Sequence, residues 1–524
     1  MLSPHSPTTA LPELSGDAVL EILLHLDNSV LFSCAQVSRL FNSLAVRLIL
    51  QRDSIINTEQ SCQTAITSYD RQPWDVVSAL LLSVHIRKIG LLRLDLSHLS
   101  RHRDLEVPLT RATRLIGRLH SLDYLCLQIS NYGHGIIDDT RLGTLCHAFE
   151  DLFNTTLSKS PRTFQLAGFE GLRLHELYRF KPAASLVSVT QLLNLFKKGS
   201  NPLPCVPKDF AYTRHGKRLT VPDRGRHPEH ISLSPDARTK VGSLNTFSSG
   251  SMCVFRAPFC SWTFPLLQAS NLASLDFNFH DLPDDPEEAR HMLSCISAAL
   301  PNLEFLSIDR VSKSHLSRVF NWLSSFKKLE NLCISDDFPV NALENTKVNL
   351  ELPETVQIHA PLEFLIDLLE GNLGRVHVPK LAWISMLQVG LDVAALRKLL
   401  DVMQHPKVKI GTVGKGELVL LMDFHWADKD IYQATIDKLA SQKSFPELVT
   451  STVSISIPGT SEEIMLGSFD SDIKIFSRAF PSVKRIVLYP CDWHRSMESI
   501  FIDPDHPERF ITEGGHPNLE VVLF

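Results

Sequence analysis

The sequence has no excess of charge that would attract a nucleic acid or an anionic membrane. Its 52 basic and 58 acidic residues leave a net charge of −6 at pH 7. The longest strongly apolar stretch, residues 76–84, is far shorter than the roughly 20 residues that cross a bilayer. The first residues, MLSPHSPTTALPELSGD, lack the basic patch and apolar run of a secretory signal peptide. We therefore expect a cytoplasmic or nuclear protein with no nucleic-acid or membrane partner.

Motifs for catalysis or cofactor binding are also missing. The ten cysteines include no CxxC pair, which argues against a disulfide framework. No GxxxxGK[ST], GxSxG or HExxH pattern occurs, and the GTVGKGE segment at residues 411–417 has the wrong spacing for a phosphate loop. Cys491 and His494 could form half of a zinc site, but no second pair matches them. The sequence therefore predicts no enzyme, no metal and no cofactor.

Apolar and charged residues are present in ordinary amounts for a protein with a packed core. They make up 44% and 21% of the 524 residues. A chain of this length can form two or more domains, or a small module followed by an extended array.

The N-terminal region is rich in large apolar residues. Ser15 can cap a helix over residues 16–25, and the polar letters LDNS then break it. Further helices are expected over residues 30–37 and from Ser38 onward. The first helix carries one apolar stripe, formed by Val19, Ile22, Leu23 and Leu26. Such short helices cannot cover this apolar surface themselves, so they pack either on the rest of the chain or on another protein.

The order of residues in this region resembles the F-box, a helical module found near the N-terminus of many eukaryotic proteins. The resemblance rests on Leu14, the pair Ile22-Leu23, Leu26, a polar break, Leu31, and Val37-Ser38-Arg39 followed by Phe41. One departure concerns the family's usual opening, Leu-Pro-x-Glu. In the register set by Ile22, the proline position holds Ser15, and the Leu-Pro-Glu at residues 11–13 comes three residues too early.

The resemblance implies a protein partner for these helices. F-boxes bind a Skp-type adaptor, which bridges to a cullin and to a RING-bound ubiquitin-conjugating enzyme. Interfaces of this kind depend on a few desolvated apolar side chains. The side chains that the resemblance assigns to adaptor binding are Leu14, Ile22, Leu23, Leu26, Leu31, Val37 and Phe41.

Strand and helix patterns alternate along the rest of the chain. An apolar-x-x-apolar-x-apolar pattern, which also arises often by chance, begins at positions 122, 272, 303, 329, 381, 483 and 519. Five prolines stand two residues before such apolar positions and separate a helix from a strand: Pro301, Pro379, Pro446, Pro481 and Pro517. The gap between positions 329 and 381 leaves room for one irregular repeat through LPETVQI. A doubly wound sheet is the alternative, but its Gly-rich phosphate turn is missing.

These patterns predict an α/β chain in which a short all-helical F-box precedes an irregular leucine-rich-repeat-like strand-helix solenoid. We expect an F-box over residues 10–52, a helical linker over 53–88 and the solenoid over 89–524, with a loop insertion at 199–245. The Pro-, Gly- and His-rich part of this insertion is basic. It is either a solvated linker or a contact for an acidic or phosphorylated substrate. The basic candidates there are Arg214, Lys217, Arg218, Arg224 and Arg226.

An F-box followed by such repeats resembles fungal F-box proteins with divergent leucine-rich repeats. The resemblance implies the substrate-recognition subunit of a Skp–cullin–F-box E3 ubiquitin ligase, with a protein substrate held on the solenoid. Two alternatives remain open. One is a non-degradative F-box scaffold without a ubiquitylation target, and the other is an enzyme on an α/β sheet whose N-terminal helices pack internally.

Overall fold

The structure, a computed structural model, divides the chain into two compact units. Unit 1 comprises Met1–Arg179 and Tyr212–Asn271, and unit 2 comprises Phe180–Ala211 and Leu272–Phe524. The residues that the structure describes are 15–52, 62–66, 73–96, 105–129, 139–172, 178–180, 212–214, 230–335, 352, 357–371, 377–378, 380–385, 393–403, 405, 407, 409–410, 418–423, 433–434, 436–437, 440–441, 450–457, 470–479, 481, 485–490, 509–510 and 520–523.

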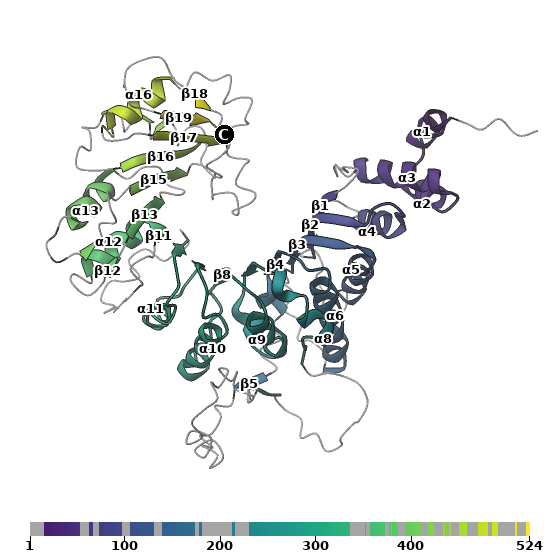
Figure 1. Cartoon of the computed structure of the whole chain (residues 1–524), viewed down its shortest axis with the longest axis horizontal. Helices are drawn as coiled ribbons and strands as arrows, with labels where there is room; N and C mark the ends of the chain where they lie inside the picture. The colour runs from purple at the N-terminus through teal and green to yellow at the C-terminus, as the bar shows by residue number, and fades with distance from the viewer. Residues whose placement is uncertain are drawn as a thin grey trace, which may run out of the picture. The chain divides into compact units, whose positions relative to one another are not determined.

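Unit 1 begins with three helices, as the sequence predicts (Figure 1). They are α1 (Gly16–Leu24), α2 (Asn28–Cys34) and α3 (Arg39–Arg52). The Ser15 hydroxyl accepts a hydrogen bond from the Ala18 amide at 3.3 Å, and this confirms Ser15 as the cap of α1. The polar break supplies the next cap, because the Asp27 carboxylate accepts from the Val30 amide at 2.9 Å.

Parallel strands and helices follow the three helices in unit 1. The strands are β1 (Cys62–Ile66), β2 (Lys88–Asp95), β3 (Ser121–Gln128), β4 (Thr163–Ala167) and β7 (Thr246–Ser249), each paired in parallel with the next in this order. The helices of eight or more residues are α4 (Pro73–Leu82), α5 (Glu106–Arg118), α6 (Asp139–Leu157) and α9 (Cys260–Ala269). Within this set, each strand lies beside the one that precedes it along the chain, which is the topology of a solenoid-like array.

The core of unit 1 lies between the strands and their helices. Leu92, Leu125, Phe164 and Phe247 stand side by side on four neighbouring strands, and all four are fully buried. Phe164 faces the helices, since its ring lies 5.6 Å from that of Phe153 on α6. One face of each strand therefore forms a continuous buried row against the helices.

Two sequence-based boundaries need correction. Residues 53–88 are not a helical linker, because they contain β1, which pairs with β2, and α4; they form the first strand-helix unit of the array. The expected insertion at 199–245 is folded at its end, where Ile231, Val241 and Leu244 are completely buried. The Asn154 side chain holds this end on α6 by donating to the Ser232 carbonyl and accepting from the Ser234 amide, both at 3.0 Å.

Unit 2 continues the alternation of strands and helices. Its strands pair in the order β8 (Ser274–Asn278), β9 (Phe305–Asp309), β10 (Asn331–Ile334), β11 (Gln357–Pro361), β13 (Lys380–Ser385), β15 (Leu418–Asp423), β16 (Thr450–Ile457), β17 (Arg485–Pro490), β19 (Glu520–Leu523) and β18 (Arg509–Phe510). All of these neighbours are parallel except β18 and β19. Strands β12 (His377–Val378) and β14 (Lys409–Ile410) form a separate pair. The helices of unit 2 with described bounds are α10 (Pro286–Ala299), α11 (Leu316–Leu323), α12 (Leu362–Gly371), α13 (Val393–Met403) and α16 (Asp470–Ala479).

The predicted strand positions are confirmed, since all seven lie within a strand or one or two residues before one. The irregular repeat expected between positions 329 and 381 is β11. Pro301 lies between the end of α10 and the start of β9, as expected for a residue that ends a helix. Pro379, Pro446 and Pro517 lie outside the described residues. A helical N-terminus followed by parallel strands and helices is therefore the observed fold class.

Candidate functional site

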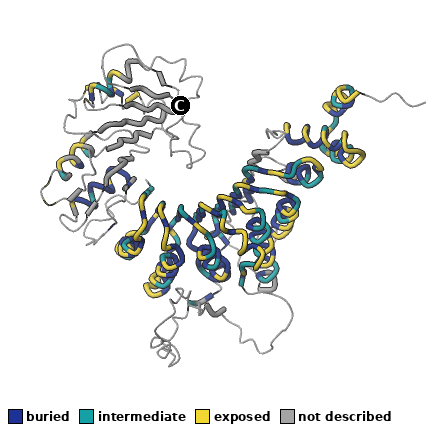
Figure 2. Tube along the Cα trace, viewed as in Figure 1, coloured by how far each residue is buried: buried dark blue, intermediate teal, exposed yellow. Residues whose placement is uncertain are grey.

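Many residues of the three N-terminal helices are exposed (Figure 2), and large apolar side chains are among the exposed residues of this segment. The described residues contain seven large hydrophobic side chains that are exposed, and five of these belong to this segment. Val37 is 72% exposed and Ile22 is 54% exposed. The other three are Leu24, Val30 and Leu40. Apolar side chains gathered in one small module are typical of a surface that another protein covers.

Two residues predicted to contact the adaptor instead belong to the core. Leu23 and Leu31 are 1% and 0% exposed, so a partner cannot reach them in this fold, and we reassign both from the interface to the core. They lie among the buried residues of the three helices, which include Val19, Ala45 and Ile49. Successive side chains of a helix are rotated by about 100°, so Leu23 faces α3 whereas Ile22 faces outward.

The other predicted contacts fall into three groups. Ile22 and Val37 are exposed, whereas Leu26 and Phe41 are half-buried. Leu14 lies outside the described residues. Of the exposed residues that the prediction missed, Val30 and Leu40 lie one residue before Leu31 and Phe41, which were assigned to the interface. Leu24 lies off the apolar stripe of α1, so periodicity offered no signal for it.

Arg52 fixes the position of α1 against the end of α3. Its guanidinium donates to the backbone carbonyls of Leu24 and Leu26 at 3.0 and 2.7 Å, and to the Asn28 side-chain oxygen at 2.9 Å. Two of these acceptors are carbonyls at the end of α1, which no further helical turn satisfies. One side chain from α3 thus holds the end of α1 and the start of α2 together.

Asn42 connects the helical module to the first strand-helix unit. Its side chain is 5% exposed, and its amide nitrogen donates to the carbonyls of Ala35 and Leu82 at 2.8 and 3.0 Å. Its oxygen accepts from the Val84 amide at 3.1 Å. Leu82 ends α4, so a single buried side chain joins α2, α3 and α4 and connects the helical module to the array.

Polar groups on this module serve local structure. The Ser29 hydroxyl and the Val30 amide donate to the Asp27 carboxylate, and these hydrogen bonds lower the pKa of Asp27 below its ordinary value. His25 and Glu21 form an exposed i,i+4 pair at 3.8 Å, a separation at which a surface pair contributes little. The Asp27 contacts cap α2 and the Glu21–His25 pair lies along α1, whereas the exposed apolar side chains are available for binding.

Some sequence candidates cannot be placed. Cys491, His494 and the glycine-rich segment at 411–417 lie outside the described residues, as do Lys217, Arg218, Arg224 and Arg226. Arg214 is part of β6 (Tyr212–Arg214), which pairs with β5 (Tyr178–Phe180). In the described part of the chain, no three His, Cys, Asp or Glu side chains gather in a way that could hold a metal ion. No helix there is long and apolar enough to cross a membrane.

Comparison with known families identifies the module. Residues 11–52 match the family model of the F-box domain, so the chain carries an F-box domain at these residues. F-box domains bind Skp-type adaptors in ubiquitin-ligase complexes, and the proteins that carry them generally act as substrate receptors. No curated protein matches the chain. The match covers the F-box alone, so the likeness of the later repeats to fungal leucine-rich repeats stays a prediction.

Proposed function

We propose that this chain is the substrate-recognition subunit of a Skp–cullin–F-box E3 ubiquitin ligase, working in the cytoplasm or nucleus. The observation that carries the proposal is the set of exposed apolar side chains on the matched F-box, led by Val37 and Ile22. Burying one such side chain completely contributes about 1.5–3 kcal/mol. An adaptor that covers several of them gains enough free energy to bind stably, because a few apolar residues dominate most interfaces.

The strand-helix array then has the task of holding a protein substrate. Arg52 holds the F-box helices together and Asn42 joins them to the first strand-helix unit, so an adaptor-bound complex would present this part of the array in a defined orientation. In this role the chain performs no covalent chemistry itself. It raises the effective concentration of a substrate lysine near the conjugating enzyme that the cullin carries.

The test is co-purification of the full chain with a Skp-type adaptor and a cullin. The variant Ile22→Asp/Val37→Asp places two charges on side chains that already face solvent, so the fold persists. The same charges would be buried and unpaired in an adaptor complex. We expect the wild type to capture the adaptor and the variant to lose it, with unchanged circular dichroism and thermal unfolding.

The matched control is Val84→Asp/Val107→Asp, which makes the same change at the two large apolar residues that are exposed outside the F-box in the described part of the chain. It should capture the adaptor as the wild type does. Equal capture by all three proteins would refute binding through this face. If the chain captures the adaptor but no protein is found whose ubiquitylation requires the chain, the result would favour a non-degradative scaffold.

A further inference from the structure

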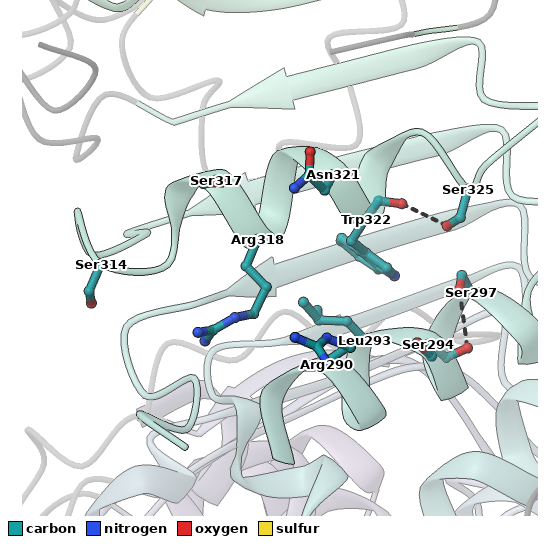
Figure 3. Close-up of a pocket in the computed structure, with 10 residues that line it drawn as sticks. All are labelled: Arg290, Leu293, Ser294, Ser297, Ser314, Ser317, Arg318, Asn321, Trp322 and Ser325. Atoms are coloured by element: carbon teal, nitrogen blue, oxygen red, sulfur yellow. Dashed lines mark hydrogen bonds between the residues drawn. The ribbon is translucent and has the colours of Figure 1, made fainter. Parts of the chain in front are cut away.

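A groove of about 590 Å³ lies between α10 and α11 in unit 2 (Figure 3). These helices belong to consecutive strand-helix repeats, and the groove is on the helical side of the array, not on the strands. Its lining carries many hydrogen-bond donors but no aspartate or glutamate. The lining residues are Arg290, Leu293, Ser294, Ser297, Ser314, Ser317, Arg318, Asn321, Trp322 and Ser325.

Two arginines provide positive charge in this groove. Arg290 extends from α10 and Arg318 from α11, and both guanidinium groups point into the space between the helices (Figure 3). Among the described residues, neither forms an ion pair with a carboxylate. Arginine presents planar donors that match a carboxylate in bidentate fashion, so two such groups without an acidic partner favour an anionic ligand.

His315 holds Arg318 in place. One Arg318 nitrogen lies 3.0 Å from His315 Nδ1, and His315 Nε2 lies 3.6 Å from the Asp284 carboxylate. Burial lowers the pKa of His315, and the neighbouring Arg318 lowers it further. A neutral His315 accepts from Arg318 at Nδ1 and turns its Nε2 proton toward Asp284. The uncharged His315 thereby positions Arg318 without neutralising the positive charge of its guanidinium group.

A buried donor in the lining lacks a partner. The Trp322 side chain is 93% buried and its indole nitrogen forms no hydrogen bond. The ring points from α11 toward α10 (Figure 3) and packs on Phe279 and Phe326 with centroid distances of 5.8 and 4.8 Å. The ring is therefore an apolar part of the lining, and its buried nitrogen is not accessible to a ligand in this structure.

We propose that this groove binds an aspartate- or glutamate-rich segment of a partner protein. The two arginines lie on the facing helices, and Ser317 and Asn321 line α11 between the ends of the groove, whereas the Ser297 and Ser325 hydroxyls already donate to backbone carbonyls. That distribution suits a run of carboxylates better than a single phosphate, which would require donors converging on one point. The inference does not depend on the F-box or on ubiquitin-ligase function, and it can hold whether or not that proposal does.

The test measures binding of a fluorescein-labelled oligoglutamate peptide to the full chain by fluorescence anisotropy. The chain's net charge of −6 gives no general attraction to an acidic peptide, so binding must come from a local site. We expect saturable binding that weakens with added salt. The variant Arg290→Gln/Arg318→Gln should bind at least about tenfold more weakly, because each arginine contributes charge-assisted hydrogen bonds.

The matched control, Arg114→Gln/Lys328→Gln, removes the same charge from exposed positions outside the groove. It should bind as the wild type does. Because Arg318 supports local structure, Arg290→Gln alone is also measured; its exposed side chain has no described partner, so a several-fold loss there cannot come from misfolding.

Three results would overturn the proposal: no binding of oligoglutamate, equal loss in the control, or no loss in the groove variants. Groove-dependent binding of a phosphoserine peptide without binding of oligoglutamate would overturn the choice of carboxylates and assign the groove to phosphate.

Discussion

The buried side chain of Asn42 provides the sharpest test of how the F-box is held on the array. The substitution Asn42→Ala removes three hydrogen bonds and leaves the Ala35 carbonyl, the Leu82 carbonyl and the Val84 amide without their partner. An unsatisfied buried group costs about 1–3 kcal/mol. The contact with Ala35 is fully buried, whereas water can reach the other two in part, so we expect a total destabilisation of about 2–4 kcal/mol.

Hydrogen exchange followed by mass spectrometry suits this prediction. A chain with two compact units has no single two-state unfolding transition, whereas exchange reports the local opening of α3 and α4. Since 1.4 kcal/mol is a factor of ten, protected amides in these helices should exchange at least about 30-fold faster. Amides of α10, in unit 2, should be unaffected. The variant Asn42→Asp should be at least as damaging, because a carboxylate cannot donate to Ala35 or Leu82.

Asn302→Ala is the matched control, since this asparagine is exposed and no hydrogen bond of its side chain is described. It should leave exchange unchanged throughout. If Asn42→Ala also leaves α3 and α4 unchanged, the F-box is not coupled to the array through this residue and the reasoning from buried hydrogen bonds fails.

Three further predictions follow from burial. Leu31→Ala should destabilise the helical module by about 2–5 kcal/mol through the cavity it leaves, and faster exchange in α1–α3 would show this. Burial lowers the pKa values of His291 and His315 below the ordinary value of 6.5. As the pH falls, these histidines therefore gain protons in the unfolded chain before they do so in the folded protein. The stability of unit 2 should fall as the pH drops below 6.5 and be unaffected above it. Thermal unfolding against pH tests this, and His291→Gln/His315→Gln should flatten the dependence. Burial also raises the pKa values of the Cys126 and Cys295 thiols to about 11, so both should react with iodoacetamide only after denaturant is added; rapid labelling of the native protein would contradict their burial.

The regular part of the fold could be predicted because local signals agreed. The helix over residues 286–299 has an apolar face with helical spacing and is followed by Pro301, which ends it. The packed segment at 230–245 had no such signal. Its buried residues, among them Ile231 and Val241, stand singly in a polar, proline-containing stretch. They fold because Asn154 and Glu150 on α6, about 80 positions earlier, provide hydrogen-bond partners.

The groove in unit 2 illustrates a second kind of information that local patterns lack. Arg290 and Arg318 belong to different helices of successive repeats, and neither is part of a motif. Only the stacking of parallel strand-helix units brings α10 beside α11. Charges that are unremarkable along the sequence thereby become neighbours in space, so their possible function depends on the fold.

Ile22 and Leu23 show that an apolar pattern in the sequence can identify a helical module without identifying which of its residues are exposed for binding. Both residues are large, apolar and part of the sequence that matches the F-box, yet Ile22 is 54% exposed and Leu23 is 1% exposed. The difference arises from where α3 crosses α1, a position that Arg52 fixes from 28 residues away. Under the proposed function we expect a charge at either position to abolish adaptor capture, at Ile22 by opposing binding and at Leu23 by opposing folding. Loss of capture therefore assigns a residue to the interface only when the variant still folds.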